Sequence, residues 1–157
     1  MITVAIAGKF DLIHEGHLDH IHQAYALGDY LIIITHPDDI VAKTSKKGVC
    51  LQTLFVRRTL LKGILKLLGD KGKVVVAWSD TDGTVAKTLE IYKPTIFAKG
   101  GDRVPGNLPQ NEIDICQKYG IEIRYGIGDL LGSSSDMCLS DSRPSPQMAL
   151  HDFKRRF

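Results

Sequence analysis

The chain has 157 residues, of which 43% are hydrophobic and 24% charged, with a formal net charge of +2. This length suits one domain with a real hydrophobic core, and the charge is too small to indicate a nucleic-acid partner. The apolar runs are far shorter than a membrane span requires, and three scattered cysteines indicate reduced thiols. Composition therefore predicts a soluble, cytoplasmic domain with no membrane and no nucleic-acid role.

Short apolar runs alternate along the chain with segments of helical periodicity. We expect strands at 2–7, 30–35, 73–77, 95–98 and 121–125, helices at 16–27, 52–68, 82–92 and 110–119, and a polar loop at 36–50. This alternation is typical of an α/β fold with a parallel sheet. Ligands of such sheets lie at the carboxyl ends of the strands, where the strand order reverses.

The segment 8–17, Gly-Lys-Phe-Asp-Leu-Ile-His-Glu-Gly-His, follows the first expected strand and opens the first expected helix. Such a junction presents unpaired backbone N–H groups and the positive end of a helix dipole, which suits phosphate. The imidazoles of His14 and His17 can donate to the same phosphate oxygens. His14, His17 and His20 follow one another at intervals of three residues, so a metal-binding cluster is an alternative. The His-Glu-x-x-His motif of zinc proteases is absent, because position 18 is Leu18. His20 and His22 are otherwise expected on the helix surface.

Basic residues follow the second expected strand. Lys43 and Lys46 lie in the expected 36–50 loop, where flexible lysines suit a mobile lid over phosphates, although a solvated loop has the same composition. Arg57 lies near the start of the next helix, either as a phosphate contact or as a surface arginine.

Two further motifs follow later strands. Lys99-Gly100-Gly101-Asp102-Arg103 combines glycines that allow close backbone approach with Lys99 and Arg103 for phosphate and Asp102 for magnesium or a sugar hydroxyl. Ser133, Ser134 and Ser135 have hydroxyls that can cap a helix and bind phosphate, although a Ser/Gly linker has the same composition. Arg124 lies nine residues before Ser133.

The 8–17 segment resembles the Gly-x-Phe-Asp-x-x-His-x-Gly-His form of the nucleotidyltransferase signature His-x-Gly-His, as found in the cytidylyltransferase branch. The resemblance, over residues 1–135, implies a Rossmann-like five-stranded parallel sheet with helices on both faces, in a domain over 1–139. It implies that His14 and His17 contact the α- and β-phosphates, that Lys43 or Lys46 closes over them, and that the serines hold the β- and γ-phosphates. Gly8, Phe10, Asp11, Gly16, Gly100 and Asp102 are then expected at the nucleotide. The family carries arginines in two further regions, for which Arg57 and Arg124 are the candidate phosphate contacts, although Arg124 lies farther from the serines than in the family.

The same resemblance implies the reaction. A phosphate of a sugar or polyol acceptor attacks the α-phosphate of a nucleoside triphosphate that carries Mg²⁺, and pyrophosphate leaves. The histidine motif favours CTP, as in glycerol-3-phosphate cytidylyltransferases, whereas Lys-Gly-Gly-Asp resembles heptose-phosphate adenylyltransferases and favours ATP. A nucleotide-binding module without turnover is the alternative from another class. We further expect a homo-oligomer, and a C-terminal tail at 140–157 that is poorly ordered or docks on a partner subunit.

Overall fold

The protein is built around one parallel sheet. The computed structural model describes residues 1–101 and 103–128. Its strands are β1 (Thr3–Ala7), β2 (Tyr30–Thr35), β3 (Gly72–Val76), β4 (Ile96–Ala98) and β5 (Glu122–Arg124). All pair in parallel in the order β3-β2-β1-β4-β5. The expected five-stranded α/β sheet is confirmed, with each strand within two residues of its predicted bounds.

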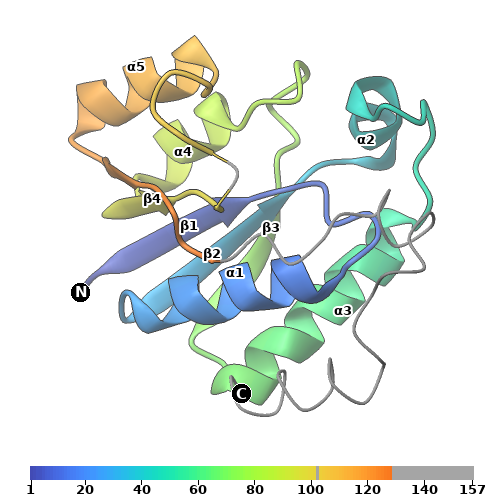
Figure 1. Cartoon of the computed structure of the whole chain (residues 1–157), viewed down its shortest axis with the longest axis horizontal. Helices are drawn as coiled ribbons and strands as arrows, with labels where there is room; N and C mark the ends of the chain where they lie inside the picture. The colour runs from blue at the N-terminus through green and yellow to red at the C-terminus, as the bar shows by residue number, and fades with distance from the viewer. Residues whose placement is uncertain (102, 129–157) are drawn as a thin grey trace.

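Helices cover both faces of this sheet (Figure 1). On one face lie α1 (Glu15–Ala26) and α3 (Leu54–Leu68), and on the other α4 (Ala86–Tyr92) and α5 (Gln110–Tyr119). Alternate strand residues supply two separate cores, with Ile33 packed on the α1 and α3 side and Ile34 on the α4 and α5 side. Burial on both faces explains why the strands read as continuous apolar runs.

The expected polar loop at 36–50 contains a helix, which corrects the sequence reading. Here α2 (Asp38–Thr44) has two aspartates in its first turn, which favours a helix N-terminus, and it buries Ile40 and Val41. Its seven residues are too few for helical periodicity to show in the sequence.

A second correction concerns the start of α4, which begins at Ala86 and not near 82. The Asp80 carboxylate accepts from the Lys87 and Thr88 amides at 2.8 and 3.1 Å, so it satisfies donors in the first turn of the helix. The residues from 81 to 85 are therefore a loop.

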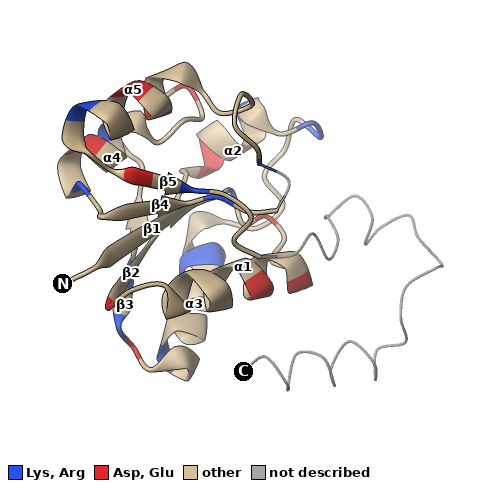
Figure 2. Ribbon diagram, turned by 60° about the vertical axis from the view of Figure 1, so that its left-hand side comes forward, with Lys and Arg blue, Asp and Glu red and all other residues tan. Residues whose placement is uncertain are grey.

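Charged residues of both signs are interspersed over the described ribbon (Figure 2), in keeping with the small net charge. Within the described ranges, none of the helices has the length and apolar character that crossing a bilayer requires.

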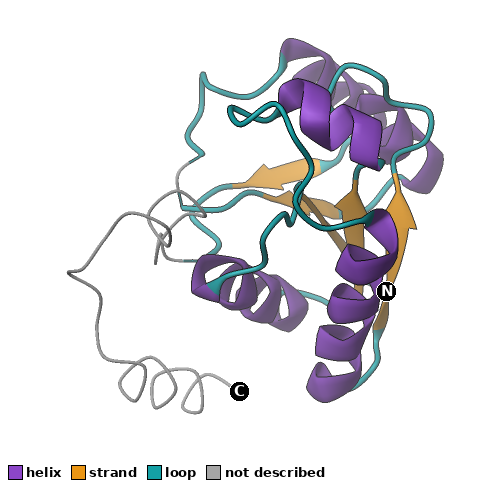
Figure 3. Ribbon diagram, turned by 90° about the vertical axis from the view of Figure 1, so that its right-hand side faces the viewer, coloured by secondary structure: helices purple, strands orange, loops and turns teal. Residues whose placement is uncertain are grey.

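The strand order places a reversal between β1 and β4 at the centre of the sheet. The chain runs outward from β1 to β3 on one side, then returns to β4 and β5 on the other. Loops leave the carboxyl ends of the strands here (Figure 3). The described candidate motif residues lie in these loops or at the starts of the helices that follow, except Lys43 and Lys46 at and after the end of α2 and Arg124 at the end of β5. Parallel sheets bind ligands at such a reversal.

Candidate active site

The two histidines of the 8–17 segment close the N-terminus of α1. His14 is the N-cap, and its Nδ1 accepts from the Gly16 amide at 3.1 Å. His17, in the first turn, accepts through its Nδ1 from the His14 amide at 3.2 Å. The rings stack with centroids 3.8 Å apart. Imidazoles thus occupy both positions of a capping box, which in other helices are filled by Ser or Thr and by Glu or Gln.

This capping arrangement determines where each ring carries its proton. A neutral imidazole donates from one nitrogen and accepts at the other. Because each Nδ1 accepts from a backbone amide, the N–H of each neutral ring lies at Nε2. Burial, together with nearby His14 and His20, lowers the pKa of His17 to about 3, although a hydrogen bond with the Leu12 backbone acts in the opposite direction. His17 is therefore a neutral hydrogen-bond donor at physiological pH.

Phe10, expected at the nucleotide, lies in the core with 1% of its surface exposed. Its φ of 52° is uncommon for a non-glycine residue and turns the chain sharply after β1. The centroid of its ring lies 5.1 Å from that of the His17 ring, so the two side chains pack against each other. Gly8 leaves room for it, because a Cβ there would lie 3.2 Å from the Phe10 ring. Phe10 is thus a supporting residue, which corrects its expected role.

Asp11 forms long-range hydrogen bonds. Its two carboxylate oxygens accept from the backbone amides of Leu51 and Gln52, each at 2.7 Å. The carboxylate therefore ties the signature loop to the segment that leads into α3. These contacts fix the loop, and the nucleotide contact expected of Asp11 stays a prediction.

Arg57, a candidate phosphate contact, is fully buried. Its Nη1 donates to the Lys9 carbonyl, the Thr35 hydroxyl and the His36 carbonyl, at 3.1, 2.9 and 2.9 Å. Its Nη2 donates to Asp38 at 2.7 Å. The guanidinium is thus used to join the ends of β1 and β2 to α2, and the phosphate role is corrected to a positioning role.

The expected lysine lid is partly helical. Lys43 lies in the last turn of α2, and Lys46 lies in the turn that follows; both are exposed. Lys9, which the motif reading did not single out, joins the two regions, since its Nζ donates to the Thr44 carbonyl at 2.6 Å. Desolvation, with nearby Arg103, lowers the pKa of Lys9.

The loop after β4 presents fewer groups than expected. Lys99 is buried, with its Nζ 3.8 Å from Glu112 Oε2 and 4.3 Å from the centre of the Phe97 ring. This ion pair joins the end of β4 to α5, and the expected role of Lys99 at phosphate stays a prediction. Gly100 is half-buried, and Arg103 is exposed and close enough to Lys9 to act on its charge. Asp102 lies outside the described residues.

After β5 the chain returns to α1. The Ile127 carbonyl lies within hydrogen-bond distance of His20 Nδ1, and a Cβ on Gly128 would lie 2.8 Å from the Cα of His20. His20, expected at the surface, thus docks this segment one turn after the signature.

Ser133, Ser134 and Ser135 lie outside the described residues, as does the 140–157 tail. Arg124 pairs with Glu122 at 2.8 Å, and its expected phosphate contact stays a prediction.

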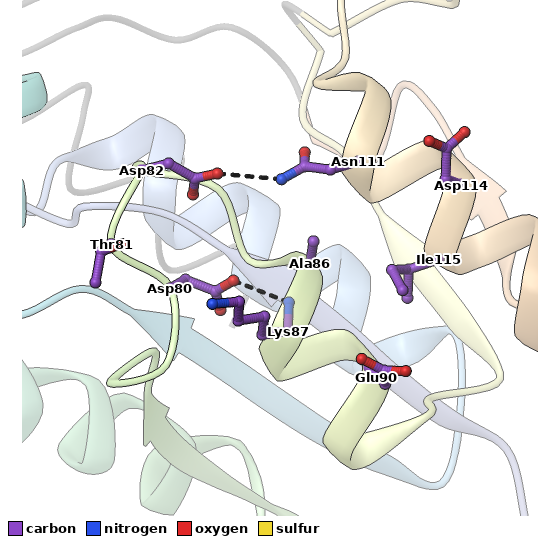
Figure 4. Close-up of a pocket in the computed structure, with 9 residues that line it drawn as sticks. All are labelled: Asp80, Thr81, Asp82, Ala86, Lys87, Glu90, Asn111, Asp114 and Ile115. Carbon is purple, nitrogen blue, oxygen red and sulfur yellow. Dashed lines mark hydrogen bonds between the residues drawn. The ribbon is translucent and has the colours of Figure 1, made fainter.

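A cavity of about 300 Å³ opens between α4 and α5 (Figure 4). Four carboxylates line it, from Asp80, Asp82, Glu90 and Asp114. Asp82 contacts Asn111 across it at 3.2 Å. Its lining includes none of the candidate phosphate-binding residues.

Over residues 1–101 and 103–128, no group of three or more His, Cys, Asp or Glu side chains is arranged to hold a metal, so the histidine-cluster alternative gains no support.

Comparison with known proteins identifies the family of this chain. Residues 5–125 match the family model described as cytidylyltransferase-like. The chain belongs to the cytidylyltransferase-like family of nucleotidyltransferases. The match begins in β1 and ends just after β5, so the family domain is the described sheet with its helices.

Curated relatives of this cytidylyltransferase-like chain include the bifunctional protein HldE. The protein from Pseudomonas syringae pv. syringae is 34% identical over 121 residues, covering 74% of this chain and 23% of its own length. The protein from Azotobacter vinelandii is 30% identical over 143 residues, covering 88% of this chain and 27% of its own. The chain therefore spans about a quarter of the length of these relatives.

A solved structure shares the fold. The lipopolysaccharide core biosynthesis protein from Thermoplasma volcanium superposes with a TM-score of 0.62 at 24% identity, covering 82% of this chain and 97% of that one. This similarity supports the Rossmann-like architecture. It confirms the fold expected from the order of elements in the sequence.

Proposed function

We propose that the chain transfers a nucleotidyl group from a nucleoside triphosphate to the phosphate of a sugar or polyol. The observation that carries this proposal is the imidazole capping box at α1. It holds two rings in fixed contact at a helix N-terminus, with their N–H donors at Nε2. Phosphate binds favourably at a helix N-terminus, and the rings add donors for its oxygens.

In the proposed reaction an oxygen of the acceptor phosphate attacks the α-phosphorus. The bond from that phosphorus to the bridging oxygen of the β-phosphate breaks, and pyrophosphate leaves with the electron pair. His14 and His17 donate to the α- and β-phosphate oxygens, where negative charge grows. Donors fixed before the reaction cost no reorganisation during it, and one such donor contributes about 10²–10³ in rate.

Other groups would complete the site. Lys43 and Lys46 would close from the end of α2, and Ser133, Ser134 and Ser135 would hold the β- and γ-phosphates. Mg²⁺ would arrive on the triphosphate, since magnesium is usually bound through phosphates with one or two carboxylates. Asp102 would be its partner on the protein. A homo-oligomer and a cytoplasmic location remain predictions from the sequence.

The choice of base has two candidates. The signature at 8–17 favours CTP, whereas Lys99-Gly100-Gly101-Asp102 resembles heptose-phosphate adenylyltransferases. The similarity to HldE proteins gives specific support to ATP and a heptose phosphate. We therefore place ATP beside CTP as the donor to be tested, with sugar and polyol phosphates as acceptors.

The first prediction is tested with His17→Gln. Glutamine is an ordinary partner at this position of a capping box, so the helix terminus keeps its cap while the imidazole is lost. We expect pyrophosphate release by the variant to fall by about 10²–10³, with the unfolding midpoint close to that of the wild type. Initial rates with CTP or ATP, Mg²⁺ and a panel of acceptor phosphates measure this.

His22→Gln is the matched control, because His22 lies on the same helix outside the signature. It should release pyrophosphate at the wild-type rate. A folded His17→Gln protein with an undiminished rate would contradict the assignment. Wild-type protein that binds triphosphate but releases no pyrophosphate with any acceptor would support a binding module instead.

A further inference from the structure

Two polar groups, one in the signature loop and one on the neighbouring strand end, are left unused by the proposed chemistry. One is the ammonium of Lys9, on the turn after β1, and the other is the ring of His36, directly after β2. The same nitrogen of Arg57 donates to the carbonyls of both residues, at 3.1 and 2.9 Å. A fully buried guanidinium thus fixes the two backbones side by side at the carboxyl edge of the sheet.

The His36 ring lacks a partner that its position demands. The residue is 3% exposed, and its Nδ1 is shut off from solvent without a hydrogen bond from any described group. Leaving such an atom unsatisfied costs about 1–3 kcal/mol, so orphaned buried nitrogens are rare without a reason. The charged groups around the ring are Asp80 and Asp82, which favour its protonation, and Lys9 and Arg57, which oppose it.

Among the described residues, Lys9 has no carboxylate partner. Its ammonium donates to the Thr44 carbonyl, and no carboxylate of the described residues lies within ion-pair distance. The neighbouring charge that acts on it is the cation Arg103, from the loop after β4. Two neighbouring cations from different loops favour the binding of an anion between them.

We infer that Lys9 and His36 bind the acceptor, with the Lys9 ammonium on its phosphate and the His36 ring on a hydroxyl group beside it. This inference rests on the proposed function. The capping box of α1 is assigned to the triphosphate. His36 directly follows β2, and the Lys9 ammonium contacts the Thr44 carbonyl at the end of α2, the helix that comes after β2. A phosphorylated, hydroxyl-bearing molecule supplies the anion that Lys9 lacks and the hydrogen bond that His36 lacks.

The test separates acceptor binding from nucleotide binding. We expect Lys9→Met to raise the KM for the acceptor phosphate about 10- to 100-fold, since a charge-assisted hydrogen bond is lost, with the KM for the triphosphate within twofold. Lys71→Met is the matched control, because Lys71 is exposed just before β3, at the opposite end of the strands. An unchanged acceptor KM, or equal rises for both substrates, would overturn the role of Lys9.

His36 is tested by two variants. His36→Leu should raise the acceptor KM about tenfold while the unfolding midpoint stays level or rises, because an unsatisfied buried nitrogen is removed. His36→Gln, which keeps a donor and an acceptor, should recover part of the lost acceptor binding. A structural role predicts the opposite for His36→Leu: a lower midpoint with an unchanged acceptor KM.

A binding measurement keeps this inference separate from the proposed reaction. Glycerol 3-phosphate and an aldose 1-phosphate are titrated without nucleotide into wild type and Lys9→Met, with the ring ¹⁵N signals of His36 as the readout. Chemical-shift changes of the His36 ring that are seen in the wild type and are smaller in Lys9→Met support the site, even where no pyrophosphate is released. A ring unmoved by either acceptor phosphate overturns it, whatever the outcome for pyrophosphate release.

Discussion

The capping of α1 by His14 and His17 and their proposed phosphate contacts use different atoms of the same rings. Their Nδ1 atoms cap α1, and their Nε2 donors are proposed for phosphate. Substitution by alanine therefore removes a cap and a donor together, and a loss of activity would not distinguish them. Glutamine at position 17 keeps the first function and removes the second.

Burial of neutral His17 makes stability depend on pH. The pKa of His17 is about 3 in the folded protein, below its ordinary value near 6.5. Between these values the unfolded chain binds a proton that the folded protein excludes. The contribution is present above about pH 6.5 and is lost as the pH falls, by about 1.4 kcal/mol per pH unit in the steep part of the window.

Urea unfolding of wild type and His17→Gln at pH 7.5, 5.5 and 4.5 measures this prediction. We expect the wild type to lose stability more steeply than the variant, by about 1.4 kcal/mol per unit between pH 5.5 and 4.5. His36 and the carboxylates titrate in both proteins, so their contributions cancel in the difference. Parallel curves for the two proteins would show that His17 is not buried as a neutral ring.

The signature residues illustrate what a motif predicts. His14 and His17 were predicted to share one loop-to-helix corner, and their stacked rings do so, because the spacing of three on a helix fixes them locally. Asp11 was placed at the nucleotide, yet its carboxylate binds backbone amides forty residues away. Such long-range partners leave no local pattern, so these contacts of Asp11 were not visible in the sequence.

At the scale of elements, α3 contributes the cation that holds the carboxyl edge together. The fully buried Arg57 donates to three carbonyls, one hydroxyl and the Asp38 carboxylate. We expect Arg57→Met to lower the free energy of unfolding by about 2–4 kcal/mol, because several buried acceptors lose their donor at once. Chemical denaturation measures this change.

Lys62→Met on the same helix is its control, since Lys62 is exposed and should change stability by less than about 0.5 kcal/mol. A surface phosphate role for Arg57 predicts instead that Arg57→Met keeps its stability and loses triphosphate affinity. The sequence could not distinguish these cases, because the position of Arg57 on a helix face does not reveal that α2 and two strand ends close over it. The sequence reading missed α2 for a similar reason, because this short helix is stabilised by the burial of Ile40 and Val41 in the folded protein.

For the whole molecule, the order of elements predicted the architecture well. Parallel strands joined by helices admit few topologies, and right-handed connections reduce them further. Element order does not determine specificity, because the base and the acceptor are recognised by loops. The family match covers residues 5–125, whereas the chain spans about a quarter of the length of its HldE relatives, so its substrates need a direct test.

A thermal-shift screen of ATP, CTP, GTP and UTP with Mg²⁺ addresses the donor base. A triphosphate at 100 times its Kd adds about 2.7 kcal/mol to folded-state stability. For a chain of this size that corresponds to a rise in Tm of about 5–10 °C. We expect the rise in Tm with either ATP or CTP to be clearly larger than with the other three triphosphates. A transferase that builds a defined product must distinguish bases when it binds the triphosphate. His17→Gln should shift less with the preferred triphosphate because it lacks one phosphate donor, and equal small shifts for all four would point to binding through the phosphates alone.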